Sequence, residues 1–463
     1  MLVLKFGGTS VADADAIRRA GAIVAARRGP RVVVVSALAG VTDGLLAVAE
    51  LACRDERAAV AALDGIVARH HEVARSIRHT TRRHLADAGV DGFARAARGV
   101  VSAIRAAGRS HPSPAASDRL VATGELWSSR LVAALFDDTG LAARWIDARE
   151  VVRTDARHQA AVPDPIATSE QVDRLVRPAL AAERIVVVGG FVGAAPDGST
   201  TTLGRGGSDY SAALLGACLA AAEIQIWTDV DGVFTADPRV IAHARLIEHL
   251  SYAEAHDLAT FGAKVLHPAT VHPAAARSIP LRVLNARRPH APGTTIGPPR
   301  EDDSGAGLTA VACRRGVLLV EVIAHDPRGH EPFAARVFHE LARAGTPVVL
   351  ADVCGNRLSI AVDETADVDA VRHRVSTFAD VRLRTGLAAV CAVGRGWSAG
   401  PGLLRDALAV LGETPVHMVA RPSGSSPLAV IVDEEHAERA LTRLHDGLMT
   451  DADAAPVEWA VGQ

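Results

Sequence analysis

Two glycine-rich segments carry residue types that suit phosphate chemistry. In the first, Lys5-Phe6-Gly7-Gly8-Thr9-Ser10 follows an apolar strand-like run, residues 1–4, and precedes a helix-compatible stretch. Adjacent glycines let backbone N–H groups approach an anion, the following helix adds the positive end of its dipole, and Lys5 supplies a mobile cation. A Gly-Gly turn after a strand is usually only a turn, so this segment alone is a weak indication of phosphoryl transfer.

The second segment, residues 189–209, strengthens that prediction. It follows the strand-like run 184–188 and combines several glycines, three consecutive threonines and Arg205 ahead of an Ala/Leu-rich helix. Hydroxyls and exposed backbone donors suit a polyphosphate, and the planar Arg205 guanidinium can hold a carboxylate or a phosphate. Ser208 or Asp209 also fits a plain N-cap of the helix, and the two roles are compatible.

The elements that must position these residues follow an α/β pattern. Strand-like runs at 31–35, 185–188, 224–228 and 281–284 alternate with Ala/Arg-rich helical stretches. This alternation predicts a layered α/β domain with a mostly parallel central sheet. Residues 293–307 are turn-rich, charged and poor in apolar residues, which indicates a linker or domain boundary.

Beyond the linker, the chain repeats one strand-and-helix plan at a spacing of roughly seventy residues, which is too long for a solenoid and fits a duplicated small domain. The first copy begins with the strand-like run 316–322 and the second with 388–393. A final strand-like run at 456–461 is a candidate to return to the first copy.

Composition indicates a soluble multidomain enzyme. The chain has 463 residues, of which 49% are hydrophobic and 22% charged, and its net charge is −3. Acidic and basic residues are interspersed, so we expect no nucleic-acid surface. No apolar run reaches the roughly 18–20 residues that span a bilayer, and no cleavable leader is evident, which predicts no membrane partner and a cytoplasmic location. The five cysteines show neither metal spacing nor a disulfide framework.

Six motifs, in the same order, resemble those of aspartokinase. They are Lys5 to Val11, Val35 to Thr42, Leu203 to Asp209, Thr228 to Val233, Asp237-Pro238-Arg239 and Phe261 to Pro268. The resemblance implies a layered amino-acid-kinase catalytic domain at 1–297, a linker at 298–308, and two small ferredoxin-like α+β ACT domains. The first regulatory domain is placed at 309–384, with 455–463 as a possible completing segment. The second is placed at 385–450. Members of the family assemble through such domains, so a homodimer or higher homo-oligomer is expected.

The implied activity is that of an ATP:L-aspartate 4-phosphotransferase, which forms 4-phospho-L-aspartate for lysine, threonine and methionine synthesis or for a dedicated pathway. The attacking carboxylate is already ionised, so no strong base is needed. The obstacle is the approach of two anions, which calls for cations and hydrogen-bond donors. By resemblance, Lys5 and Lys264 lie near the phosphates and Asp209 orients Lys5; lysine is otherwise scarce in the chain.

Substrate roles also follow from the resemblance. Glu125 would accept the α-ammonium of L-aspartate and Arg205 would hold its α-carboxylate. The reacting carboxylate would contact Ser36, Thr42 and Ser208. Taken alone, Glu125 fits a helix-start glutamate that favours the helix dipole.

ATP would be bound by Gly7, Gly8, Thr228, Asp229, Phe234, Arg239 and Lys264. Phe234 stands where many members have tyrosine, so ring stacking is kept and a hydroxyl hydrogen bond is lost. Mg²⁺ is expected to be held mainly through the phosphates. No dedicated protein metal site is predicted, and the adjacent His70 and His71 fit a solvated helix.

Regulation is where the resemblance is weakest. Lysine-inhibited relatives carry an Asp followed by Thr/Ser residues at the second strand of the first ACT domain, whereas residues 348–357 here place valines and Cys354 at those positions. An ammonium-bearing effector would lose several hydrogen bonds, each worth on the order of 1 kcal/mol. We therefore expect weak or altered feedback inhibition. The turn at 400–403 is where such domains receive an amino acid.

Three alternatives compete with this interpretation. A kinase acting on glutamate or acetylglutamate would share the core, but is not expected to combine the Lys5 to Val11 signature with paired ACT-like units. A non-catalytic amino-acid sensor would explain those units, but not Lys5, Arg205, Asp209 and Lys264 together. A dinucleotide oxidoreductase is disfavoured, because no G-x-G-x-x-G follows the first strand.

Overall fold

The computed structural model describes residues 1–182, 184–263, 265–300, 307–326, 330–395, 402–420 and 427–449. The chain forms two compact units. The first comprises residues 1–233, 248–252 and 265–298, and the second comprises 234–247, 253–264 and 299–463. The predicted catalytic domain at 1–297 thus differs from the first unit at two segments, 234–247 and 253–264, which group with the C-terminal part of the chain.

An eight-stranded sheet in the order β3-β4-β2-β1-β7-β9-β10-β8 forms the centre of the first unit. Every pairing in it is parallel except β9 with β10, which confirms the predicted mostly parallel sheet. The strands are β1 Leu2–Phe6, β2 Arg31–Val35, β3 Ala143–Ile146, β4 Ile185–Gly189, β7 Glu223–Thr228, β8 His249–Ser251, β9 Leu281–Asn285 and β10 Thr294–Gly297. β4 is buried at all five positions and β2 at four of five. Both faces of the sheet are covered, which explains why these strands are continuous apolar runs in the sequence.

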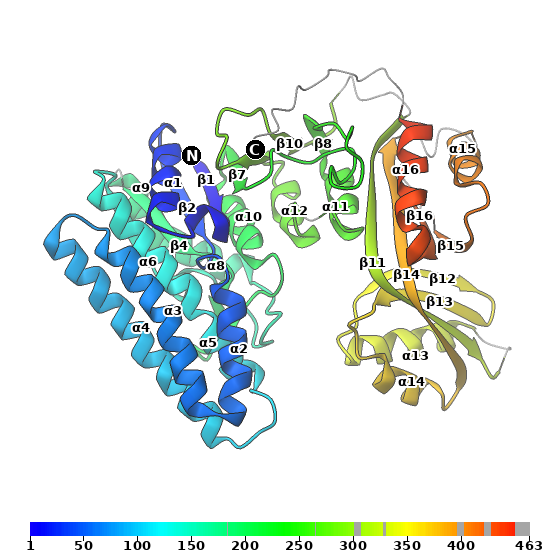
Figure 1. The fold of residues 1–463 in the computed structure, drawn as a ribbon, viewed down its shortest axis with the longest axis horizontal. Helices are drawn as coiled ribbons and strands as arrows, with labels where there is room; N and C mark the ends of the chain where they lie inside the picture. Colours follow the sequence, from blue (N-terminus) through cyan, green and yellow to red (C-terminus); the bar gives the residue numbers. More distant parts are fainter. Residues whose placement is uncertain are drawn as a thin grey trace. The chain divides into compact units, whose positions relative to one another are not determined.

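Helices surround this sheet, and Figure 1 shows the long α3, α4 and α6 side by side. The helical elements are η1 Gly8–Val11, α1 Ala14–Ala25, α2 Val41–Arg54, α3 Glu56–Arg75, α4 Thr80–Ala106, α5 Pro114–Val121, α6 Thr123–Asp138, α7 Ala148–Val151, α8 Pro165–Gln171, η2 Val172–Val176, α9 Arg177–Ala181, α10 Gly207–Leu219 and α12 Pro268–Ala275. A hairpin of β5, Val192–Ala194, and β6, Thr200–Thr202, precedes α10. Within the described residues, no helix combines the length and the apolar character needed to cross a membrane.

One sequence-based prediction in this helical layer is wrong. His70 on α3 is fully buried, not solvated, and its ring lies 4.6 Å from that of Trp127 on α6. Its Nδ1 contacts the carbonyl oxygen of Ile66 at 2.8 Å, and burial lowers the pKa of His70 to about 4. His71 on the same helix instead contacts Asp87 and Asp91 of α4.

The second unit is built on a six-stranded antiparallel sheet in the order β12-β13-β11-β14-β16-β15. The strands are β11 Gly307–Ala324, β12 Val348–Cys354, β13 Arg357–Asp363, β14 Ala379–Arg395, β15 Val416–Ala420 and β16 Leu428–Asp433. The helices are α11 Tyr252–Thr260, α13 His330–Arg343, α14 Val368–Val375, α15 Gly402–Leu411, η4 Glu434–His436 and α16 Ala437–Leu448.

Two lobes of this unit share the long strands β11 and β14, which Figure 1 shows curving through the whole sheet. The first lobe has α13, β12, β13 and α14 over its own apolar core, and the second has α15, β15, β16 and α16 over another. Gly316 and Gly386 have φ of 65° and 69°, and the register shifts beside Gly316, which is how a strand bends at a bulge. The predicted domain limit at residues 384 and 385 therefore falls inside one continuous strand. The predicted strand at 456–461 lies outside the described residues.

Candidate active site

The parallel strands of the first unit end at a common level. Phe6 is in register with Val35 of β2 and Trp227 of β7, and Val35 is in register with Gly189 of β4. The residues that follow the strands gather along one edge, since the carboxyl ends of parallel strands point the same way. They are Gly7, Ser36, Gly190 and Asp229. Ligands of open α/β sheets bind at this edge.

A buried ion pair joins β1 to α10 at this edge. Lys5 is only 8% exposed, and its Nζ lies 2.5 Å from Oδ1 of Asp209 in the first turn of α10. A Cβ added to Gly7 would lie 3.6 Å from the same Nζ, so the first glycine turn runs past the ammonium. The predicted orientation of Lys5 by Asp209 corresponds to this contact, and the cation stands beside backbone donors suited to a phosphate.

Glycine is required where α10 meets the sheet. A Cβ on Gly190 would lie 2.7 Å from both Cα and Cβ of Ser208, which real side chains do not tolerate. A Cβ on Gly8 would lie 3.0 Å from the carbonyl oxygen of Ala37. The absence of side chains at these two glycines lets the strand-end turns and the α10 N-terminus pack directly together, which places Ser208 at the edge.

Glu125 is a buried carboxyl group with unfilled hydrogen-bonding capacity. It lies in the first turn of α6 and is 3% exposed. Its Oε1 accepts the Ala37 N–H at 3.2 Å, whereas its Oε2 is buried and has no hydrogen-bond partner. Burial raises the pKa of Glu125 to about 8, against the opposing effect of the backbone hydrogen bonds. An ammonium group placed against Oε2 would supply both the missing partner and the compensating charge.

The remaining predicted substrate residues lie after β2 or just before α10. Ser36 follows β2, its N–H donates to the carbonyl oxygen of Phe6, and its own carbonyl accepts the Ser128 hydroxyl at 2.7 Å. Thr42 is half-buried in the first turn of α2. Arg205 is exposed in the turn before α10, and among the described residues its guanidinium has no carboxylate partner.

Two of the predicted nucleotide residues lie at the end of β7: Thr228 is its last residue and Asp229 follows it. The Thr228 hydroxyl donates to Oδ1 of Asp229 at 3.2 Å. Both line a narrow pocket with residues of η1 and α1, including Thr9 and Arg19.

The other predicted nucleotide residues belong to the second unit. Phe234 forms an isolated bridge with Leu246, and Arg239 makes a two-point ion pair with Asp237 at 3.0 and 2.6 Å. Lys264 lies outside the described residues. Two positions before it, Gly262 has φ of 103°, and an added Cβ would lie 2.5 Å from a carbonyl oxygen of β11.

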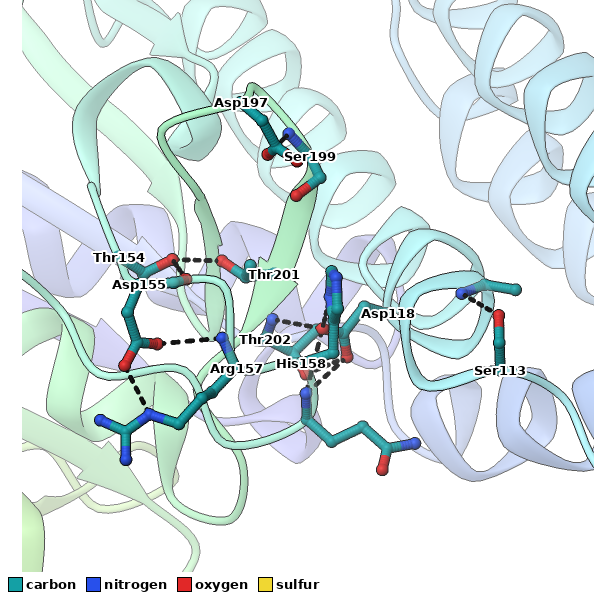
Figure 2. Close-up of polar contacts among 12 residues, drawn as sticks. Ser113, Asp118, Thr154, Asp155, Arg157, His158, Asp197, Ser199, Thr201 and Thr202 are labelled. Atoms are coloured by element: carbon teal, nitrogen blue, oxygen red, sulfur yellow. Dashed lines mark hydrogen bonds and ion pairs between the residues drawn. The ribbon is translucent and has the colours of Figure 1, made fainter.

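Sequence reasoning missed Asp118, a buried carboxylate that organises the turn before Arg205. Asp118 on α5 is 2% exposed. Its oxygens accept the Thr202 hydroxyl at 2.6 Å, the Thr202 N–H at 3.1 Å, the Gln159 N–H at 3.0 Å and a contact from His158 Nδ1 at 2.9 Å (Figure 2). The sequence around Asp118, between Ser117 and Arg119 on a predicted helical stretch, carries no signal that this acidic residue is buried.

A second contact in Figure 2 fixes the same turn. The hydroxyls of Thr154 and Thr201 lie 2.7 Å apart, and both residues are buried. Strand β6, which ends at Thr202, is thus held from both sides just three residues before Arg205. The position of the Arg205 backbone is therefore set by α5 and by the 154–159 loop.

Known proteins similar to this chain agree in family. Residues 1–285 match the model of the amino acid kinase family. The chain is 36% identical to the lysine-sensitive aspartokinase 3 of Escherichia coli over 460 residues, which cover 97% of this chain and 99% of that protein. It is also 31% identical to the chloroplastic aspartokinase 3 of Arabidopsis thaliana, covering 99% of this chain and 84% of that protein.

Solved structures give the same result. The crystal structure of E. coli aspartokinase III in complex with aspartate and ADP matches with a TM-score of 0.88 at 34% identity, covering 96% of this chain and 99% of that one. The structure of that protein in complex with lysine and aspartate matches with a TM-score of 0.78, also at 34% identity, over 97% of this chain and 100% of that one.

Proposed function

Because the chain belongs to the aspartokinases of the amino acid kinase family, we propose that it acts as an ATP:L-aspartate 4-phosphotransferase. One oxygen of the aspartate side-chain carboxylate attacks the γ-phosphorus of ATP, and the bond from that phosphorus to the bridging oxygen of ADP breaks. The products are 4-phospho-L-aspartate and ADP. The observation that carries the proposal is that two buried ionisable side chains, Lys5 and Glu125, serve the same strand-end edge.

Lys5 would reduce the electrostatic repulsion between the aspartate carboxylate and the phosphates of ATP. Its ammonium is held by Asp209 beside the Gly7 turn, so it needs little reorganisation when charge develops on the transferred group. The α10 N-terminus adds partial positive charge from the same side. Asp209 acts here as a positioning residue, since its contact is with Lys5.

Glu125 and Arg205 would recognise the amino-acid part of the substrate. The free Oε2 of Glu125 suits the α-ammonium, because the pair satisfies a buried acceptor and restores the ionised form of the carboxyl group. The exposed Arg205 guanidinium suits the α-carboxylate, and Ser36, Thr42 and Ser208 supply hydroxyls for the reacting carboxylate. Glutamate is longer by one methylene, so its reacting group would be displaced from the phosphate.

ATP would be bound through the strand-end turns, with Thr228 and Asp229 at the end of β7. Mg²⁺ fits this site as an ion held chiefly by the phosphates and water: among the described residues of the first unit, no three carboxylate or histidine ligands converge, and Asp209 is engaged with Lys5. When bound, the ion would neutralise charge on the phosphate oxygens. A cytoplasmic location and assembly through the small domains remain predictions from the sequence.

The proposal is tested by trapping the acyl phosphate with hydroxylamine in the presence of ATP and Mg²⁺. L-Aspartate, L-glutamate and N-acetylglutamate are compared, each with the wild type, Lys5→Ala and Arg98→Ala. Arg98 is a matched control, because it forms an exposed ion pair with Asp64 away from the sheet edge. Product from aspartate alone, lost only in Lys5→Ala, is the expected result. Product from none of the three acids would favour the non-catalytic sensor, and product from another acid would reassign the substrate.

A further inference from the structure

A cluster of metal-ligating side chains lies in the second unit, where segment 234–247 meets α16. His243 Nε2 lies 2.9 Å from Oδ1 of Asp446, and His445 Nδ1 lies 3.1 Å from the same oxygen. One ligand atom from each of the three residues lies within 4.8 Å of the others. In the described part of the chain, this is the one place where three such side chains converge so closely.

The surroundings of His445 suit a metal-bound imidazole. His445 is 3% exposed, and its Nε2 lies 3.0 Å from the Thr235 hydroxyl oxygen, which also accepts the Arg245 N–H at 2.9 Å. In the metal-bound form, the imidazole proton would lie on Nε2 and be donated to this hydroxyl oxygen, which has two lone pairs and can accept both bonds. The Nδ1 lone pair, which faces Asp446 Oδ1, would then be free for the ion. Metal-bound histidines are oriented by such a second hydrogen bond.

We propose that His243, His445 and Asp446 bind a divalent transition-metal ion of the zinc class. Two imidazole nitrogens and one carboxylate oxygen form a donor set that zinc favours, whereas Mg²⁺ and Ca²⁺ prefer oxygen ligands alone. Tetrahedral zinc, with bonds of about 2.0–2.2 Å, places its ligand atoms about 3.3 Å apart, close to the two short separations here. The His243 and Asp446 side chains are 65% and 48% exposed, so water can reach the fourth position.

The ion would connect two parts of the chain that are distant in sequence. His243 and Asp446 are 203 residues apart. Segment 234–247 already packs its apolar side chains, Ala236, Ile241 and Ala244, into the same core as α16. Little rearrangement is therefore needed to complete the site, and binding would stabilise the folded second unit by mass action.

The experiment is a Co²⁺ titration of the full-length, metal-stripped protein, followed by visible absorption, which is intense for tetrahedral and weak for octahedral Co²⁺. We expect one equivalent of tetrahedral Co²⁺ per chain, displaced by Zn²⁺. His243→Ala and Asp446→Asn should each weaken binding by at least about tenfold, and Thr235→Val by about 10–100-fold through loss of the second hydrogen bond. These variants spare the buried His445, whose replacement endangers folding.

His325→Ala is the matched control, because His325 and Asp380 form an exposed pair of the same chemistry with no third ligand among the described residues. It should bind Co²⁺ as the wild type does. Zn²⁺ should also raise the melting temperature of the wild type and of His325→Ala, but not that of His243→Ala. Absence of stoichiometric tetrahedral binding in the wild type, or equal affinity in His243→Ala, would overturn the proposal.

Discussion

The two units treat buried charge differently. In the first, Lys5, Asp118 and Glu125 are all at least nine-tenths buried, and each serves the strand-end edge or the turn before Arg205. In the second, the buried Glu254 accepts the Thr309 hydroxyl, the sheet covers two apolar clusters, and the strand predicted to face an effector, β12, is largely exposed. Burying a charge costs free energy unless it is paired. In the first unit, these buried charges lie at or near the proposed binding site for a charged substrate.

Strand β12, which is predicted to face the effector, exposes apolar and weakly polar side chains instead of burying charged ones. Val353 on β12 is 46% exposed and Cys354 is exposed, at positions where a lysine-binding relative is expected to offer hydroxyls. Exposed apolar or weakly polar side chains have no buried hydrogen-bonding group that a ligand would have to pair. We therefore predict that the chain keeps the requirements of catalysis more strictly than those of lysine feedback, and experiments can break or sharpen this comparison.

The largest effect is expected for Lys5→Ala. Loss of the cation beside the transferred group should lower kcat for aspartate phosphorylation by at least about 10²–10³-fold. Steady-state kinetics at saturating ATP measures it, with Arg98→Ala as the control that should keep wild-type activity. A change below tenfold would mean that Lys5 is not part of the catalytic machinery.

Glu125→Gln should weaken aspartate binding, with a KM increase of about 10²-fold, because a neutral amide cannot pair with the α-ammonium. In the wild type, kcat/KM for aspartate should rise with pH up to about 8, since the carboxyl group must ionise before it binds the ammonium. The pH dependence should disappear in the variant. An unchanged pH profile in Glu125→Gln would argue against this role.

The raised pKa of Glu125 also predicts the sign of a stability difference between the wild type and Glu125→Gln. Its folded-state pKa of about 8 is raised above the usual 4.5, so its contribution to stability is complete below about pH 4.5 and is lost as pH rises through 8. Above that pH the wild type contains an ionised, partnerless buried oxygen. Glu125→Gln should therefore melt higher than the wild type at about pH 9, and this advantage should vanish at about pH 5. Equal differences at both pH values would contradict the assignment.

Asp118→Asn should have an intermediate effect. The amide keeps the shape but cannot accept all of the bonds from Thr202, Gln159 and His158, so the turn before Arg205 loosens. We expect the KM for aspartate to rise by about tenfold with a smaller change in kcat. Asp197→Asn is the control, since Asp197 accepts the N–H of its near neighbour Ser199 on an exposed turn (Figure 2). A uniform loss of kcat with unchanged KM would indicate a general folding defect.

The smallest effect is expected from added lysine. Loss of two hydrogen bonds of on the order of 1 kcal/mol each would weaken effector binding by about 30-fold. Millimolar L-lysine should therefore change the initial rate by less than about twofold, unlike a relative named as lysine-sensitive. L-Threonine serves as the comparison effector. Strong inhibition by millimolar lysine would show that β12 recognises it through other groups.

Much of the fold could be predicted from the sequence, because strand patterns are local. The predicted runs 31–35 and 281–284 coincide with β2 and β9 to within a residue. The shared strands of the second unit were missed, because Arg384, Thr385 and Gly386 interrupt the apolar run and resemble a turn between two domains, although β14 continues through them. The burial of His70 was missed because it depends on Trp127 of another helix.

By itself, the sequence determined the family, the strand-and-helix order, and the turns whose glycines and charged residues suit phosphate. Those properties depend on residue type and near-neighbour spacing. Only the tertiary structure decided that one Glu125 oxygen is buried without a partner, that Asp118 binds the Thr202 hydroxyl, and that His243 meets Asp446. Such contacts depend on strand register and helix packing across tens to hundreds of residues, and no local pattern encodes them.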